Sequence, residues 1–236
     1  MKNTVTCPNC SSENPYYKFT CSNCNSFIRD RISNLDLWNI TGKLIESPVT
    51  AFRQIIYSDH KNYILFILFF VVIKFLIDAR FISLLTIGRF TTITSLPVSF
   101  LLILLSLTVL LFSFTFIFTR INSSSGFSTR FKDIFSLLTY SQLPHVFGLA
   151  VLFPIELIIF GDYIFSLNPS PFAIKELIAY TLLSVEVLLI LWSVFLSVTA
   201  FYVHFHKVIP ALVSALMFNG LLILLLYLSS IYIFII

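Results

Sequence analysis

Residues 98–118 read VSFLLILLSLTVLLFSFTFIF and contain no charged side chain. As a helix, this stretch would extend about 31 Å, which matches the hydrocarbon core of a bilayer. Across the 236 residues of the chain, 58% are hydrophobic and 11% are charged, whereas a soluble domain carries about 25% charged residues. The chain therefore has too few charges to cover a folded surface in water. The sequence predicts an all-α polytopic membrane protein and excludes a soluble enzyme.

Four further stretches are apolar enough to predict membrane-spanning helices, at residues 63–77, 143–161, 177–203 and 211–236. The first of them is short and carries Lys74. Pro144 and Pro154 lie in another, where we expect them to kink the helix. Together with residues 98–118, these stretches predict a five-helix transmembrane bundle over residues 62–236.

Basic residues predict the orientation of this bundle, because cytosolic loops carry more Lys and Arg than outer loops. If the amino end is cytosolic, all but four of the 15 basic residues lie in inner segments. The outer segments then hold Arg80, Arg89 and Lys175. No hydrophobic run follows a basic start before residue 61, so we expect no signal peptide. We therefore predict a cytosolic amino terminus and, because the number of spans is odd, a carboxyl terminus on the outside.

All four cysteines lie within the first 24 residues, in the motifs CPNC at residues 7–10 and CSNC at residues 21–24. Two such C-x2-C turns that face each other supply the four thiolates of a tetrahedral zinc site. We expect a short β-hairpin over residues 15–20. Asn9, Asn23 and Asn25 lie in or next to the two turns and tolerate the left-handed backbone that such turns often require. The sequence thus predicts a zinc ribbon over residues 1–28, with structural zinc held by Cys7, Cys10, Cys21 and Cys24.

Two other interpretations of these cysteines are a redox dithiol and a pair of disulfides. A reducing cytosol disfavours both, and a redox C-x-x-C motif usually lies at a βα junction, which this sequence lacks. Because four thiolates leave no open coordination position, we expect the zinc to stabilise a docking module rather than to catalyse a reaction. The net charge of +4, without a dense basic stripe, argues against nucleic acid as a partner.

Residues 29–61 form an amphipathic connector, in which apolar residues recur at helical spacing between basic ones. Ser47 and Pro48 predict the start of a second short helix within it. This pattern is typical of helices that lie in the membrane interface, with Trp38 at the level of the headgroups. The alternative is a pair of helices packed on the ribbon.

Three charged residues fall within the predicted spans: Lys74, Glu156 and Glu186. An ionised group at the centre of a span costs about 2.5–3.5 kcal/mol, so such residues usually pair or face a polar cavity. Each lies about 6 Å to the outer side of the midpoint of its span, so Lys74 could meet either glutamate at one level. This intramembrane polar cluster is either a pocket for a lipid headgroup, ion or proton, or a packing pair that fixes helix register.

The chain from Leu35 onward resembles the Ypt-interacting-protein (Yip) family of membrane proteins. The resemblance rests on the pre-membrane segment LDLWNITGKLIESPVTAFRQI, on the inner-loop segment FSTRFKDIFSLLTYSQLPHVFG and on the five closely spaced spans. A ribbon ahead of this domain is similar to the prokaryotic branch. The resemblance implies a Yip-like transmembrane domain with a cytosolic amino end in a prokaryotic cell membrane. Eukaryotic members of the family that this chain resembles bind prenylated Rab-type GTPases. We do not extend that role to this chain, because the acidic, tyrosine-bearing pre-membrane motif of those members is not matched here.

The sequence contains no His-Glu-x-x-His, Gly-x-Ser-x-Gly or paired intramembrane Asp motif. We therefore expect a non-enzymatic membrane scaffold or adaptor with a role in membrane organisation or trafficking. Its expected partners are the lipid bilayer and a cytosolic protein that docks on the ribbon, and association into a homo-oligomer is left open. The alternative function is that of a lipid-moving protein or a transporter of ions or solutes that uses the intramembrane polar cluster.

Overall fold

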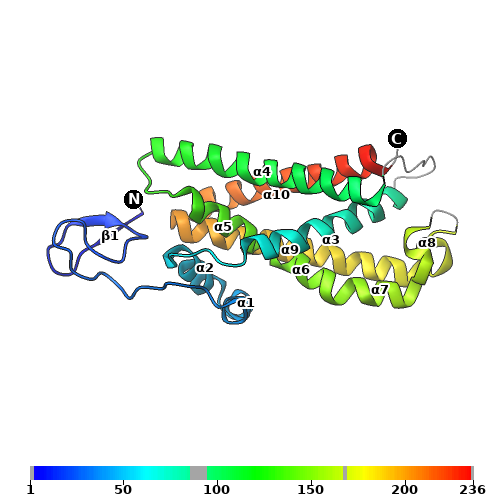
Figure 1. The fold of residues 1–236 in the computed structure, drawn as a ribbon, viewed down its shortest axis with the longest axis horizontal. Coiled ribbons are helices and arrows are strands. Elements are labelled where there is room, and N and C mark those ends of the chain that lie inside the picture. The colour runs from blue at the N-terminus through cyan, green and yellow to red at the C-terminus, as the bar shows by residue number, and fades with distance from the viewer. Residues whose placement is uncertain (1–2, 86–94, 167–168, 235–236) are drawn as a thin grey trace. The chain divides into compact units, whose positions relative to one another are not determined.

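The computed structural model describes residues 3–85, 95–166 and 169–234. The described residues form mostly helices (Figure 1), with a small two-stranded sheet near the amino end. Arg89 and the last two residues of the predicted span 211–236 lie outside the described residues.

The chain divides into two compact units, each of which is described by itself. The first unit consists of Met1–Ile64, Leu111–Ser141 and Leu196–Leu216. The second unit consists of Leu65–Leu110, Gln142–Phe195 and Met217–Ile236. This division does not follow the three consecutive segments predicted from the sequence, whose boundaries stay a prediction.

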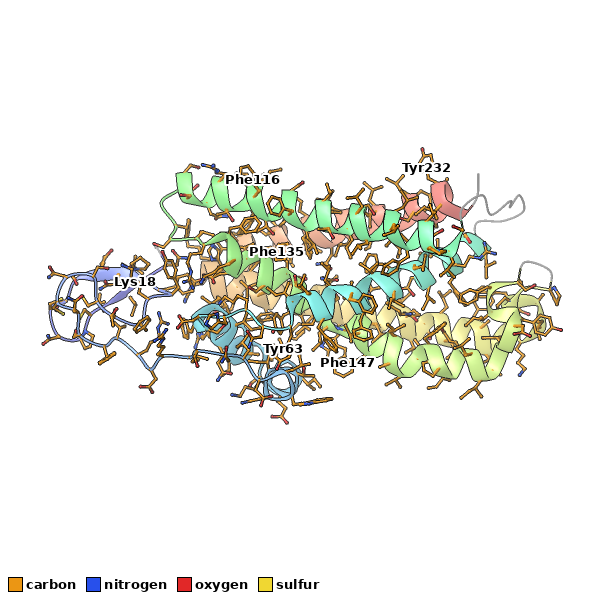
Figure 2. All side chains as sticks on the ribbon, viewed as in Figure 1. Lys18, Tyr63, Phe116, Phe135, Phe147 and Tyr232 are labelled. Atoms are coloured by element: carbon orange, nitrogen blue, oxygen red, sulfur yellow. The ribbon has the colours of Figure 1, made fainter. Side chains whose placement is uncertain are left out.

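Four helical segments are long and apolar enough to cross a membrane, as expected of an integral membrane protein: Leu96–Ser124, Phe131–Phe165, Glu176–Phe205 and Val208–Ile233. At most 39% of the apolar window of each is buried within the protein. Many of the remaining apolar side chains, such as Phe116 and Tyr232 in Figure 2, are exposed. Exposed apolar surface on this scale requires a nonpolar environment.

The fifth predicted span is a helix, α3 (Ile64–Leu85), which is long enough to cross a bilayer. It carries Lys74, Asp78 and Arg80, so its composition does not mark it as a span. The count of five membrane-spanning helices is therefore not established by length and composition, which identify four. The predicted span ended at residue 77, with an extension into residues 79–96 left open, and the helix continues for two more turns.

The remaining long helices agree with the prediction in place but not in length. They are α4 (Leu96–Ser124), α9 (Glu176–Phe205) and α10 (Val208–Phe234). The predicted span 143–161 lies in a longer helical stretch that begins at Phe131. It consists of α5 (Phe131–Ser141), α6 (Leu143–Phe147), a π-helical turn η1 (Gly148–Leu152), α7 (Phe153–Phe160) and a 3-10 turn η2 (Gly161–Phe165).

Pro144 and Pro154 lie where this stretch changes its helical type. Each occupies one of the first two positions of a new segment, α6 and α7. Proline lacks the N–H that would continue the hydrogen-bond ladder, which explains the interruptions at these two positions. A further short helix, α8 (Pro171–Ile174), precedes α9 and begins on a third proline.

The connector forms two short helices, α1 (Leu37–Glu46) and α2 (Pro48–Tyr57). Asp36 caps α1 by accepting a hydrogen bond from the Asn39 N–H at 3.0 Å. Pro48 begins α2 as expected, although the Ser47 side chain makes no capping hydrogen bond.

The two connector helices differ in what they bury. In the first unit, α2 packs on α5 (Figure 1) through a buried face that consists of Ala51, Phe52, Ile55 and Ile56. By contrast, α1 leaves Trp38 84% exposed and Ile45 57% exposed. An exposed tryptophan beside an apolar residue fits the expected position at the membrane interface, whereas α2 is a packed helix of the unit.

A buried ion cluster joins the end of α2 to the start of α5. Asp133 is 1% exposed, and its carboxylate lies 3.1 Å from the Lys61 Nζ and 2.7 Å from the Arg130 Nε. Both cations also donate to carbonyls at the end of α2, including that of Ile56 at 2.9 Å and 3.0 Å. The last carbonyls of a helix lack partners within it, so these bonds stabilise its end.

The cluster explains how the helix Phe131–Ser141, in a segment that was predicted to be an inner loop, can bury Asp133. Lys61 and Arg130 neutralise the Asp133 carboxylate, so the packed interior holds no unpaired charge at this position. Burial lowers the pKa of Lys61 to about 8, because desolvation disfavours the ammonium more strongly than Asp133 stabilises it.

We predict that Asp133→Asn destabilises the protein by about 3–5 kcal/mol, because it leaves the buried Lys61 ammonium and the partly exposed Arg130 without their carboxylate. The matched control is Asp59→Asn, which removes an exposed ion pair with Arg31 at 2.6 Å and should change stability by no more than about 1 kcal/mol. Thermal unfolding of the full-length protein in detergent measures both. Equal losses in the two variants would contradict the role assigned to Asp133.

Candidate metal centre and buried ion cluster

The four cysteine side chains converge on one point in the first unit. Their sulfur atoms all lie within 4.8 Å of one another, and none forms a disulfide. The Cys7–Cys24 and Cys10–Cys21 sulfur pairs are each separated by 3.6 Å. A tetrahedral site with metal–sulfur bonds of about 2.3 Å places its sulfurs about 3.8 Å apart. The thiols therefore have the number, proximity and spacing to hold a metal ion.

The two C-x2-C motifs fold into matching turns, residues 7–12 and 21–26. In each turn, the N–H of the first cysteine donates to the carbonyl of the serine five residues later, at 3.0 Å and 2.9 Å. In each, the residue after the second cysteine has left-handed backbone, with φ of 56° at Ser11 and 58° at Asn25. The left-handed backbone is thus confirmed at Asn25 but is not found at Asn9 or Asn23, and a serine takes this conformation in the first turn.

The strands lie in other places than the predicted hairpin at residues 15–20. Strand β1 (Thr4–Thr6) pairs antiparallel with β2 (Glu13–Pro15), so the sheet brackets the first turn. An isolated bridge between Thr20 and Phe27 brackets the second turn in the same way. Each half of the ribbon therefore holds its own cysteine pair between two extended segments, and the segment between the halves is not a hairpin.

Two serines that the sequence did not single out complete the centre. The Ser12 hydroxyl lies 3.1 Å from the sulfurs of both Cys10 and Cys21. The Ser26 hydroxyl lies 3.2 Å and 3.0 Å from the sulfurs of the other two cysteines. The signal was present in the sequence, since each serine follows the second cysteine of its motif by two positions.

Hydrogen bonding favours the thiolate form, which binds metal, at Cys10 and Cys21, whereas the pKa of Cys24 is raised by its contact with Cys10, by burial and by its contact with Cys7. The bond from Ser12, helped by backbone N–H groups, lowers the pKa of Cys21 to about 5. Because a metal binds the thiolate rather than the thiol, a lowered pKa reduces the number of protons that binding must displace.

The ribbon is attached to the rest of the first unit by specific contacts. Asn3 exchanges two hydrogen bonds with the Ser128 backbone, at 3.1 Å and 2.8 Å. The Tyr16 hydroxyl lies 3.4 Å from Nδ1 of His204, whose Nε2 lies 3.3 Å from the Thr129 hydroxyl. The ring of His204 thus joins the ribbon to the helical part of the unit, and both its nitrogens are occupied by these contacts.

A second group of charges lies in the second unit, between α3 and α9. Lys74 is fully buried, and its ammonium lies 2.7 Å from the Asp78 carboxylate and forms an ion pair with Glu186 as well. The structure thus brings together two of the three predicted residues, Lys74 and Glu186. Asp78 was missed because the predicted span ended one residue before it, although the i, i+4 spacing from Lys74 was visible.

Glu156 does not join this ion pair. It lies on α7 and is 2% exposed, and among the described residues no basic side chain forms an ion pair with it. The sequence placed the three charges at one level but could not fix which faces of the helices meet. The ion cluster therefore consists of Lys74, Asp78 and Glu186, with a buried carboxyl group outside it.

Gly148, in the π-helical turn, leaves room for the Lys74 side chain. A Cβ atom at Gly148 would lie 3.0 Å from the Lys74 Cε and 2.7 Å from the Leu189 Cδ1. These separations are closer than van der Waals contact, so any side chain here would displace the lysine or the leucine. The close approach of this backbone to Lys74 thus explains glycine at this position.

Comparison with protein-family models, with curated proteins and with solved structures finds no match to this chain.

We predict that Lys74→Met destabilises the protein by about 3–5 kcal/mol, because two half-buried carboxylates lose their counter-charge. Combining it with Glu186→Gln should restore part of the loss, with a coupling energy of about 0.5–3 kcal/mol between the two sites. Glu176→Gln changes an exposed acid on the helix that also carries Glu186, and it serves as the control. Its small effect should add to that of Lys74→Met without any coupling. Thermal unfolding of the four variants measures the coupling, and strict additivity of the Lys74 and Glu186 variants would contradict the ion pair.

Proposed function

We propose that this chain is a non-enzymatic membrane scaffold whose amino-terminal ribbon binds zinc and docks a cytosolic protein. The observation that carries this proposal is the convergence of four cysteine thiols in a ribbon that is hydrogen-bonded to helical segments of its own unit. We also propose that the protein is Yip-like and resides in a prokaryotic cell membrane, as the sequence resemblance implies.

Zinc is the metal that best suits this centre. Four thiolates in tetrahedral arrangement are typical of structural zinc sites, and a cytosolic setting favours zinc over disulfides. Four protein ligands leave no position for a substrate, which supports a structural role for the ion. The ribbon has few buried side chains of its own, so its fold depends on the metal.

The ribbon presents an apolar side chain that nothing in its unit covers. Phe27 is 76% exposed and directly follows the second cysteine turn. Aromatic side chains that are exposed on a rigid support are typical centres of protein–protein contacts. The contacts of Asn3 and Tyr16 hold the ribbon in a fixed position within its unit, so a partner would meet a rigid surface.

The proposed topology has five spans, with α3 as the first. Its Lys74 and Asp78 neutralise each other and involve Glu186, so the helix brings less net charge into the bilayer than its composition suggests. Five spans place the two ends of the chain on opposite faces. The positive-inside pattern of the basic residues then puts the ribbon in the cytosol.

We predict that epitope tags at the two ends become accessible on opposite sides of sealed vesicles, because five spans are odd in number. Protease digestion before and after permeabilisation measures this, with a tag at Gly126, between α4 and α5, as the control for the inner face. Both end tags on one face would exclude five spans.

We predict that Cys21→Ser releases one zinc ion per chain and abolishes partner capture, because the ribbon loses its fold. Phe27→Ser should retain the zinc yet lose the partner, since it alters only the exposed surface. The matched control is Trp38→Ser, which changes an equally exposed aromatic residue outside the ribbon and should retain both. Zinc content by elemental analysis and crosslinking in intact cells, followed by mass spectrometry, measure these effects. A partner set unchanged in Cys21→Ser would exclude docking.

A second candidate function is the movement of lipid, ions or solutes through the second unit. It is favoured by the excess of acid there, because Asp78, Glu186 and Glu156 are opposed by Lys74 alone in the described ion pairs. Buried acids in excess of bases in a membrane protein mark proton and ion pathways. If the variant with an unfolded ribbon captured the same partners, docking would be excluded and this function would be the remaining candidate.

A further inference from the structure

A cavity of about 530 Å³ lies in the first unit, between the ribbon and the turn that joins α9 to α10. Its walls come from both ends of the ribbon, from Tyr57 at the end of α2 and from residues 205–207. Cavities of about 300–1,000 Å³ are typical of sites for small ligands. The cavity is separate from the cysteine centre and is not used by the proposed docking function.

The charged side chains that line this cavity are all positive. Arg29 and Lys207 contribute permanent positive charges and His206 contributes an imidazole, while none of the described residues that line the cavity is Asp or Glu. Among the described residues, neither Arg29 nor Lys207 takes part in an ion pair. The cavity therefore concentrates positive charge without a carboxylate from the protein to balance it.

Arg29 is held in place by neutral groups. Its Nε donates to the Lys18 carbonyl at 2.9 Å, its Nη2 donates to the carbonyls of Tyr16 and Lys18, and its guanidinium lies 3.6 Å from the centre of the Tyr57 ring. Carbonyls and an aromatic face orient a guanidinium but do not neutralise it. Burial also lowers the pKa of Arg29, as expected for a cation without a counter-ion.

The opposite wall is a tight turn with an unusual backbone. His206 has φ of 55°, a left-handed conformation that is uncommon for a residue with a side chain. His206 and Lys207 are the only two residues between α9 and α10, and both side chains are exposed. Strained residues of this kind are often found where a side chain must be directed at a ligand.

From this cavity we propose that the protein binds a phosphate ester, with its phosphate between Arg29 and Lys207. The Arg29 guanidinium, held in place by these contacts, supplies a fixed positive charge, while the Lys207 ammonium supplies a flexible point charge. The turn between two candidate membrane spans lies at a membrane face, where the phosphate of an anionic lipid is present at high concentration. A soluble phosphate ester carries the same group, and the experiment distinguishes the two sources.

The test uses the full-length protein in nanodiscs of phosphatidylcholine, with and without phosphatidylglycerol. Native mass spectrometry measures the phosphatidylglycerol retained on each chain, and thermal unfolding measures its stabilising effect. Glycerol 3-phosphate, added to phosphatidylcholine nanodiscs, is the soluble probe. Lys207→Gln removes one charge from the rim of the cavity, and Lys132→Gln removes one from an exposed lysine that does not line it.

We expect binding of one of the two probes, weakened about tenfold by Lys207→Gln through loss of one charge-assisted contact and unchanged by Lys132→Gln. Retention of phosphatidylglycerol identifies the lipid as the source, and a response to glycerol 3-phosphate alone identifies a soluble ester. Binding of neither probe, or equal losses in the two lysine variants, would overturn the proposal. Because neither lysine belongs to the ribbon, zinc content and partner capture should stay unchanged, which separates this test from that of docking.

Discussion

The first unit depends on the ion pairs of the Asp133 carboxylate. Asp133 pairs with Lys61 and Arg130, and both cations donate hydrogen bonds to carbonyls at the end of α2. One buried acid thereby joins the connector to α5 and lets a charged segment be helical within a packed interior. Breaking such a pair by removing one partner is far more costly than never forming it. The position of α2, and with it the route of the chain from the ribbon to α3, follows from this ion cluster.

The same rule applies in the second unit, where α3 carries charges that set its composition apart from that of the four candidate spans. Lys74 and Asp78 look like interruptions of an apolar stretch, yet they are one turn apart and pair with each other and with Glu186. A charge that is neutralised by its neighbour counts for less in a bilayer than a lone charge. Gly148 contributes by its lack of a side chain, which lets the π-helical turn approach the lysine closely.

The sequence predicted the features that depend on periodicity and spacing. Uncharged stretches such as residues 98–118 identified the helices, and two C-x2-C motifs identified the cysteines that converge. Features that depend on pairing across the fold were missed, including the helical start at Phe131 and the bracketing strands of the ribbon. Asp78 was missed for another reason, since the predicted span ended before it. Local composition shows that a charge is present but not where its partner lies. The separate position of Glu156 was unpredictable for the same reason, since the rotation of each helix is set by packing.

The connection between α9 and α10 is only two residues long. A link of this length is too short to contain a folded domain. It also cannot keep one helix in water while the other helix lies in the bilayer. The two apolar segments leave the ribosome within moments of each other and form a helical hairpin. Biogenesis of this region is therefore expected to be concerted, with the pair passing from the translocon into lipid as one element.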